Sequence, residues 1–95
     1  MLSDYRVRLL TLIDETGSLA EAASRMGLSY RRAWGKVREI EENLAVKLVV
    51  SAAGGAGGGG STLTAEARSL VERYRRFRSA AEQHLAREFA AAFGR

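Results

Sequence analysis

The sequence predicts a mostly α-helical fold in which three short helices precede a short β-hairpin and one long final helix. Three observations support this prediction. Capping residues followed by apolar residues at helical spacing mark four helix starts, at Ser3, Ser18, Ser29 and Thr64. Six of the ten glycines fall within residues 51–61, where no helix can persist. After residue 64, apolar residues recur at helical spacing almost to the end of the chain.

Length and composition exclude several classes of protein. A chain of 95 residues suits a single domain, and 46% hydrophobic with 27% charged residues is a globular composition. No apolar run approaches the ~20 residues that a membrane-spanning helix needs, and the first residues lack the pattern of a secretory signal. We therefore expect a cytoplasmic protein with no membrane partner. The net charge of +4 is compatible with a nucleic-acid partner.

The residue inventory also disfavours catalysis. The sequence has no cysteine and a single histidine, His84, which leaves little material for a nucleophile or a metal site. Its carboxylates lie among basic residues on helix faces, and we interpret them as solvated ion pairs. We therefore expect no enzymatic activity, no metal and no cofactor.

The first two helices are short and stop at glycines. The first is expected to run from its serine cap to about Glu15, with apolar residues on two sides, and to end at Gly17. Ser18 caps the second helix, and Glu21 completes a capping box with it. Gly27 ends this helix after barely two turns.

The third helix, residues 30–44, is expected to be apolar on one side and cationic on the other. Ala33, Val37 and Ile40 recur at spacings that place them on one buried stripe. The opposite side carries arginines, and Trp34, at the edge of the stripe, is interpreted as a packing residue. Two short helices joined by residues 27–29, the second with a cationic outer face, are the layout of a helix-turn-helix.

A β-hairpin is expected after the third helix. Residues 48–50 and 61–63 flank the glycine tract like two short strands with a long, loose tip. A tip that orders against DNA and a tip that is merely loose are both open interpretations. A hairpin in this position is the wing of a winged helix-turn-helix. We predict a winged helix-turn-helix domain at residues 1–64, with its wing at about 48–63, and a long linker and dimerisation helix at residues 65–95.

The last helix is too long for so small a domain to cover by itself. From Ala65 to about Phe93 it would span roughly 43 Å at about 1.5 Å per residue. Its apolar seam needs a partner, and the simplest partner is the same helix of a second copy. We expect a homodimer built from this helix and the outer stripe of the first one, through Tyr5, Leu9, Leu12, Leu70, Tyr74, Phe77, Ala81, Leu85 and Phe89.

Several segments together carry a family resemblance. They are Gly17-Ser18-Leu19-Ala20-Glu21-Ala22-Ala23, Leu28-Ser29-Tyr30-Arg31-Arg32-Ala33-Trp34, Glu41-Glu42-Asn43-Leu44, the glycine-rich wing and Leu63-Thr64. From about Leu9 to Phe77 the chain resembles the N-terminal DNA-binding domain of ModE-type molybdate-responsive transcription regulators, near the LysR-type helix-turn-helix group. The resemblance implies a dimeric winged-helix DNA-binding unit, here without the molybdate-binding domains of full-length members. One departure is Ala45, where the family usually has glycine.

The third helix would enter the major groove, where the four base pairs present different hydrogen-bonding patterns. Arginines of its first turn are expected at base edges or phosphates, a glycine allows close approach, and later basic residues contact phosphates. Serine caps offer helix N-terminal amides to phosphate. The predicted DNA-contacting residues are Ser18, Ser29, Tyr30, Arg31, Arg32, Gly35, Lys36 and Arg38. The arginines of the last helix are instead interpreted as a solvated face with intrahelical partners such as Glu72.

The sequence is compatible with two functions. The first is a sequence-specific regulator of transcription that binds double-stranded DNA as a homodimer, with residues 30–44 in the major groove. The alternative is a protein-interaction module in which the long helix pairs with a different helix and no DNA is bound.

Overall fold

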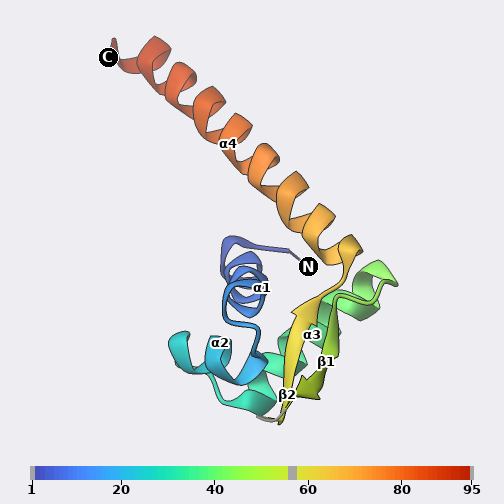
Figure 1. Cartoon of the computed structure of the whole chain (residues 1–95). Coiled ribbons are helices and arrows are strands. Elements are labelled where there is room, and N and C mark those ends of the chain that lie inside the picture. Colours follow the sequence, from blue (N-terminus) through green and yellow to red (C-terminus); the bar gives the residue numbers. More distant parts are fainter. Residues whose placement is uncertain (1, 56–57, 95) are drawn as a thin grey trace.

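Four helices and one antiparallel hairpin make up the part of the chain that the structure describes. This computed structural model describes residues 2–55 and 58–94, and the side chains of residues 52–59 lie outside the description. In chain order the elements are α1 (Asp4–Thr16), α2 (Leu19–Arg25), α3 (Tyr30–Leu44), β1 (Val49–Gly55), β2 (Gly58–Leu63) and α4 (Ala65–Phe93). The predicted fold class and the predicted order of elements are confirmed (Figure 1).

The four predicted helix caps are also confirmed. The side chains of Ser3, Ser18, Ser29 and Thr64 each accept a hydrogen bond from the backbone amide three residues further along the chain. Each bond satisfies an amide of the first helical turn that has no intrahelical acceptor. These local bonds fix where each helix begins.

Only one of the two hydrogen bonds of the capping box predicted at the start of α2 is present. Ser18 Oγ accepts from the Glu21 amide at 3.0 Å. The Ser18 amide, however, donates to Thr16 Oγ1 at 3.2 Å, while the Glu21 carboxylate accepts from Arg25 at 3.3 Å. The reciprocal half of the prediction is wrong, because Thr16 already satisfies the amide that Glu21 was expected to bind.

Left-handed backbone ends both α1 and α3. Gly17 has a φ of 68°, and its carbonyl accepts from the Ser61 amide at 2.9 Å, which ties β2 to the turn between α1 and α2. Ala45 ends α3 with a φ of 54°. A Cβ disfavours this conformation, so Ala45 is strained where the family resemblance leads one to expect glycine.

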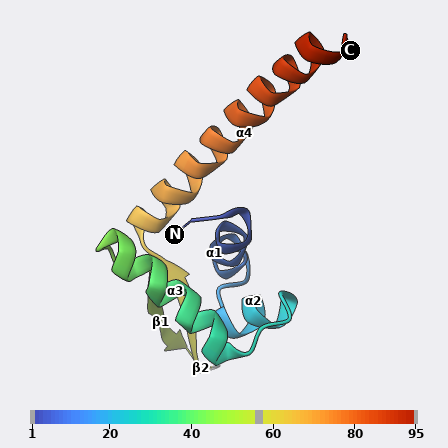
Figure 2. The same cartoon turned by 180° about the vertical axis from the view of Figure 1, so that it is seen from behind.

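The core lies between α1, α2, α3, the base of the hairpin and the first turns of α4. Figure 2 shows α3 in front of the two strands, with α1 and α2 beside it. The predicted buried stripe of α3 is confirmed at Ala33, Val37 and Ile40, each 0% exposed. The other buried apolar residues are Val7, Leu9, Leu10, Leu12, Ile13, Leu19, Ala22, Ala23, Leu48, Val49, Leu63, Ala67 and Val71.

The wing lies where the sequence predicted it, but its two strands are longer than the predicted 48–50 and 61–63. β1 pairs with β2 in antiparallel register, with Val49 opposite Leu63 and Ser51 opposite Ser61. The ladder continues into the glycine tract, with an irregularity between Ala52 and Gly55. Glycine weakens a strand but does not prevent it, because its backbone can still form ladder bonds. The expected loose tip is thus shorter than predicted, and residues 56–57 at its centre lie outside the described residues.

α4 is anchored at one end and projects from the domain at the other. Ala67 and Val71 pack in the core, whereas every side chain from residue 75 to residue 89 is exposed. The projecting part makes the molecule elongated, with extents of 59 × 27 × 21 Å (Figure 1). Within the described residues, none of the helices is both long and apolar enough to cross a membrane.

Candidate nucleic-acid interface

The outer face of α3 presents arginines that have no carboxylate partner among the residues that the structure describes. Arg31, Arg32 and Arg38 are all exposed. Within residues 2–55 and 58–94, their guanidinium groups form no ion pair, whereas Arg25 on neighbouring α2 pairs with Glu21 at 3.3 Å. Arginines that are exposed and unneutralised keep both their charge and their N–H donors for an anionic partner.

Gly35 leaves a bare stretch of backbone in the middle of this face. It is exposed, and a Cβ built on it would meet no heavy atom within 4 Å. The packing of the protein itself therefore does not require glycine here, although glycine costs ~1 kcal/mol of helix propensity relative to alanine. The missing side chain leaves the middle of this face open to close approach by another surface.

The wing-side flank of α3 carries a stack of three side chains. The Tyr30 and Trp34 rings meet edge to face, with centroids 6.4 Å apart. The guanidinium carbon of Arg38 lies 5.5 Å from the centroid of the Trp34 ring. Trp34 is half-buried and packs against the core, as predicted, but it also contacts two of the predicted DNA-contacting residues.

The opposite flank of α3 faces the start of α1. Lys36 Nζ lies 5.3 Å from the centroid of the Tyr5 ring, and Glu39 pairs with Arg6. The hydrogen bond and charge of Arg6 hold the pKa of Glu39 below its usual value. Lys36 is half-buried on this flank, whereas the arginines of the outer face are exposed.

The two serine caps occupy the helix starts next to this face. The Ser18 and Ser29 hydroxyls already accept from backbone amides of α2 and α3. A hollow of about 250 Å³ lies between α2, α3 and the wing. It is lined by Ser18, Leu19, Ala20, Tyr30, Trp34, Ser51, Gly60 and Ser61. Of the predicted DNA-contacting residues, Ser18 and Tyr30 line this hollow.

Glu41, which the sequence did not single out as a functional residue, fixes the wing to α3. Glu41 Oε2 accepts hydrogen bonds from the backbone amides of Leu48 at 2.8 Å and Val49 at 3.3 Å. This carboxylate holds the first strand of the wing against the last turn of α3. Glu41 lies in the last turn of α3, a few residues before the hairpin, but nothing in the sequence spacing distinguishes it from Glu42, which is exposed.

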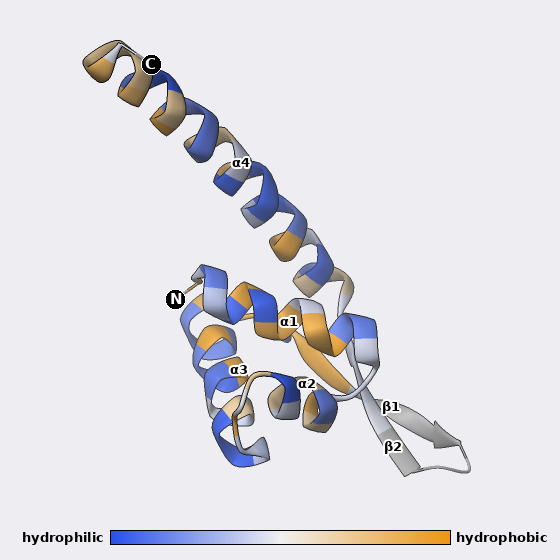
Figure 3. Cartoon of the chain, turned by 90° about the vertical axis from the view of Figure 1, so that its left-hand side faces the viewer, coloured by the Kyte–Doolittle hydropathy of each residue, from blue (hydrophilic) through white to orange (hydrophobic). Residues whose placement is uncertain are grey.

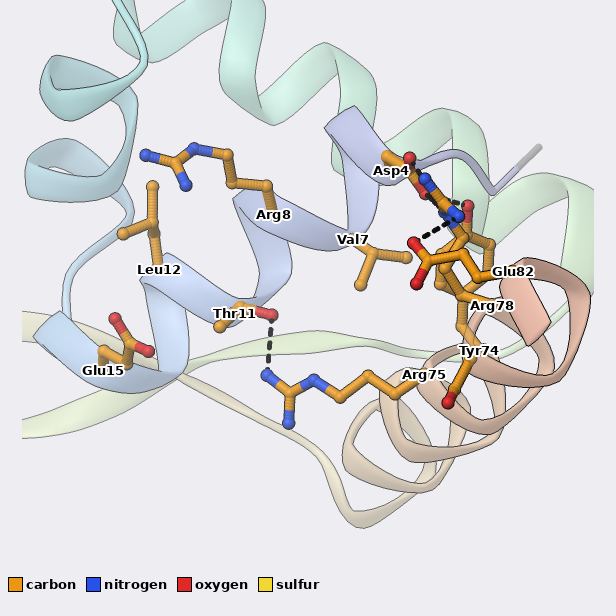
Figure 4. A pocket seen from close by; sticks show the side chains of 11 residues that line it. Asp4, Val7, Arg8, Thr11, Leu12, Glu15, Tyr74, Arg75, Arg78 and Glu82 are labelled. Carbon is orange, nitrogen blue, oxygen red and sulfur yellow. Dashed lines mark hydrogen bonds and ion pairs between the residues drawn. The ribbon is translucent and has the colours of Figure 1, made fainter. Parts of the chain in front are cut away.

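A polar clasp joins α1 to α4 (Figure 4). Arg68 pairs with Asp14 at 3.2 Å, Arg75 donates to Thr11 at 3.4 Å, and Arg78 pairs with Asp4 at 3.1 Å. The interpretation that intrahelical residues such as Glu72 pair with these arginines is wrong for Arg68 and Arg75, which bind residues outside α4. It is confirmed for Arg78, which also pairs with Glu82 of α4 at 2.7 Å. The partners lie on α1 because the first turns of α4 pack against it.

The clasp perturbs the titration of its own members. The hydroxyl of Tyr74 and then the guanidinium of Arg78 hold the pKa of Asp4 below its ordinary value. The same hydrogen bond to Asp4 raises the pKa of Tyr74. A groove of about 530 Å³ opens between the two helices next to these residues, with Val7 and Leu12 in its floor.

The residues predicted to form the dimer surface range from buried to exposed in this protomer. Leu9 is 0% exposed inside its own protomer, so its assignment to the dimer surface is wrong. It points into the core because α1 buries most of its circumference. Leu12 is 7% exposed, Leu70 and Tyr74 are half-buried, and Tyr5 is exposed beneath Lys36. The members on the projecting part of α4, Phe77, Ala81, Leu85 and Phe89, are exposed.

The sequence of this domain matches a known family of regulators. Residues 5–68 match the family described as bacterial regulatory helix-turn-helix protein, lysR family. The chain belongs to this family. The match covers α1, the helix-turn-helix, the wing and the start of α4 of this LysR-type domain.

Two curated relatives are similar to the LysR-type domain over much of its length. The molybdenum-pterin-binding protein MopB of Rhodobacter capsulatus is 44% identical over 69 residues. The molybdenum transport protein ModE of Azotobacter vinelandii is 40% identical over 74 residues. These alignments cover 73% and 78% of this chain but only 26% and 27% of the relatives, so the chain spans about a quarter of their length.

Solved structures show the same fold in complexes with DNA. The CbnR DNA-binding domain in a DNA complex is 25% identical, with a TM-score of 0.72 over 96% of this chain and 99% of that one. Full-length CbnR with its target DNA gives a TM-score of 0.71 at 26% identity, over 98% of this chain and 31% of that one. The winged helix-turn-helix architecture of the LysR-type domain is thereby confirmed.

Proposed function

We propose that this chain is the DNA-binding domain of a transcription regulator that acts as a homodimer, with α3 in the major groove of its duplex. Family membership supports a regulator, and the CbnR structures show that a relative with the same fold binds DNA. The proposal is one of binding without catalysis, and it places the protein in the cytoplasm, where bacterial DNA lies. It concerns this domain alone and assigns it no effector.

The observation that carries the proposal is the outer face of α3. Arg31 and Arg32 are exposed and have no carboxylate partner in the described part of the chain, and they lie beside the bare backbone of Gly35. An arginine fork matches the O6 and N7 acceptors of guanine, so these two residues are the candidates for base recognition. Arg38 and Lys36, at the flanks, are candidates for phosphate contacts, which position the helix without specifying sequence.

The projecting part of α4 supports the homodimer. Phe77, Leu85 and Phe89 are 63%, 70% and 57% exposed along one 29-residue helix, which is unusual for a domain that acts alone. A second copy offers an identical apolar seam, and two-fold symmetry lets each seam cover the other. A dimer of this kind predicts a palindromic duplex with half-sites about one or two helical turns apart. Specific affinities in such systems are typically about 10⁻⁸–10⁻¹¹ M at physiological salt.

Charge reversal on α3 tests the proposal. We expect Arg31→Glu with Arg32→Glu to abolish binding to a duplex selected by the wild-type protein from a random pool, because two cations facing the groove become anions. Binding is measured by fluorescence anisotropy, the fold by circular dichroism, and the oligomeric state by sedimentation.

A matched control comes from α4. Arg73→Glu with Arg76→Glu makes the same change in net charge at two exposed residues of α4, outside the outer face of α3. This control should keep most of the affinity. Wild-type affinity in the α3 variant, or an equal loss in both variants, would show that the outer face of α3 does not enter the groove.

The exposed apolar seam of α4 also suits a second function, a protein-interaction module without DNA binding. In that case the seam would cover a helix of another protein, and the arginines of α3 would be solvated. The charge-reversal pair separates the two functions, because a pure interaction module is indifferent to the charge of α3.

A further inference from the structure

The wing-side flank of α3 contains an arginine that is held in place by a ring. Arg38 lies over Trp34, and Tyr30 meets the same indole edge to face, so residues four apart along α3 form one continuous stack. Trp34 is half-buried and packed against the core, which gives the stack a fixed base. The two outer members are exposed.

The stack leaves its arginine without a carboxylate partner among the described residues, unlike the ion pairs that other arginines form. Arg68 and Arg78 each pair with a carboxylate, which neutralises them. Within residues 2–55 and 58–94, Arg38 forms no ion pair, even though Glu41 and Glu42 follow it by three and four residues. Glu41 is occupied by the backbone amides of Leu48 and Val49. Arg38 is therefore oriented by an uncharged surface and keeps its full positive charge.

This arrangement has a physical consequence for binding an anion. A flexible arginine loses side-chain entropy when it is fixed against a phosphate, and this loss reduces the affinity. A guanidinium resting on an indole face is already restricted, and its N–H groups point outward from the edge of its plane.

We propose that Trp34 is a positioning residue for DNA binding, which holds Arg38 ready to contact a backbone phosphate on the wing side of α3. This inference rests on the proposed function and adds to it a residue that was interpreted as packing alone. Trp34 itself contacts no base, because bases in a duplex are stacked and offer no free face. Its contribution to affinity passes through Arg38.

A double-mutant cycle tests this dependence. Trp34→Leu keeps an apolar side chain in the core but removes the ring face, and Arg38→Ala removes the guanidinium. Trp34→Leu should weaken binding to the selected duplex about two- to fivefold, the usual effect of an exposed cation–π contact. The double variant should bind no more weakly than Arg38→Ala alone, and Trp34→Phe should restore part of the affinity. Thermal unfolding checks that each variant is folded.

The opposite flank of α3 supplies the control. Arg32→Ala should weaken binding by the same factor with Trp34 or with leucine at that position, because Arg32 does not touch the ring. Effects of Trp34→Leu and Arg38→Ala that multiply independently would overturn the inference while leaving the proposed function intact. A wild-type protein that binds no duplex would overturn the proposed function and the inference with it.

Fluorescence offers a readout that does not depend on DNA. Trp34 is the only tryptophan of the chain, so its emission reports on this stack alone. Arg38→Ala should uncover the indole face in the free protein and increase quenching of its emission by acrylamide, whereas Arg32→Ala should leave quenching unchanged. Equal quenching in the wild type and in Arg38→Ala would show that the stack does not form in solution, which also overturns the inference.

Discussion

At the scale of single residues, substitution of Gly35 should have opposite effects on the stability of the fold and on DNA binding. Gly35→Ala should raise the free energy of unfolding by ~1 kcal/mol, because a Cβ there meets no heavy atom within 4 Å among the described residues beyond its own helix backbone, and alanine favours the helix. The same methyl group should hold α3 away from the groove and weaken duplex binding about tenfold, the effect of about 1.4 kcal/mol of steric cost. Chemical denaturation and anisotropy titration measure the two effects.

Asn43→Ala is the matched control for this prediction. It also replaces a poor helix former by alanine at an exposed position of α3, but near its far end. It should stabilise the fold and leave binding unchanged. Unchanged binding in Gly35→Ala as well would mean that the bare backbone does not face the DNA.

At the scale of elements, the clasp between α1 and α4 predicts a dependence on pH. The pKa of Asp4 is held below its ordinary value of 3.8 by Tyr74 and Arg78, so the ionised carboxylate stabilises the folded state. This stabilisation is fully present well above pH 3.8 and is lost as the pH falls through the lowered pKa. Asp4→Asn should therefore lower the unfolding temperature near pH 7, and the difference from wild type should disappear in acid.

Thermal unfolding over a pH series measures this difference. The pair between Arg6 and Glu39 also weakens in acid, but it is present in both proteins and cancels from the comparison. A difference that stays constant from neutral to acid pH would contradict a role for the charge of Asp4 and leave only the loss of a helix-starting residue.

The elements also show how far a sequence can predict this structure. The helix starts follow from Ser3, Ser29 and similar caps, because such bonds are local. The bonds from Arg78 to Asp4 join residues 74 positions apart, and no periodicity within either helix predicts them. Leu9 was assigned to the dimer surface, whereas it lies in the core. When a helix has apolar residues on two sides, the sequence does not show which side packs in its own core and which could contact a partner. The strands of the wing extend further into the glycine tract than the residue types predict. Glycine has a low propensity for strands, but its backbone can still form the hydrogen bonds between them.

At the scale of the whole molecule, the projecting part of α4 predicts the oligomeric state. Figure 3 shows apolar residues recurring along α4 beyond the domain. Phe89→Glu should convert the dimer to a monomer, because a charge buried in an apolar seam is strongly disfavoured. The variant should also lose affinity for a two-half-site duplex. Sedimentation velocity measures the mass, and Gln83→Glu, an exposed position on the other side of the helix, is the control.

The dimer prediction has a clear contrary result. A wild-type chain that sediments as a monomer at concentrations where it binds DNA would show that α4 does not pair with itself. An unchanged dimer in Phe89→Glu would instead place the contact elsewhere on the molecule, and the groove between α1 and α4 would be the next candidate.

The most direct measurement asks which groove of the duplex the protein occupies. Purines of the selected duplex are replaced one at a time, either by 7-deaza analogues, which lack N7 in the major groove, or by 3-deazaadenine, which lacks N3 in the minor groove. With α3 in the major groove, 7-deaza substitution should weaken binding at a few positions repeated in both half-sites, and Arg32→Ala should remove the sensitivity at one of them. Binding that is indifferent to every 7-deaza substitution and sensitive to loss of N3 would contradict the placement of α3.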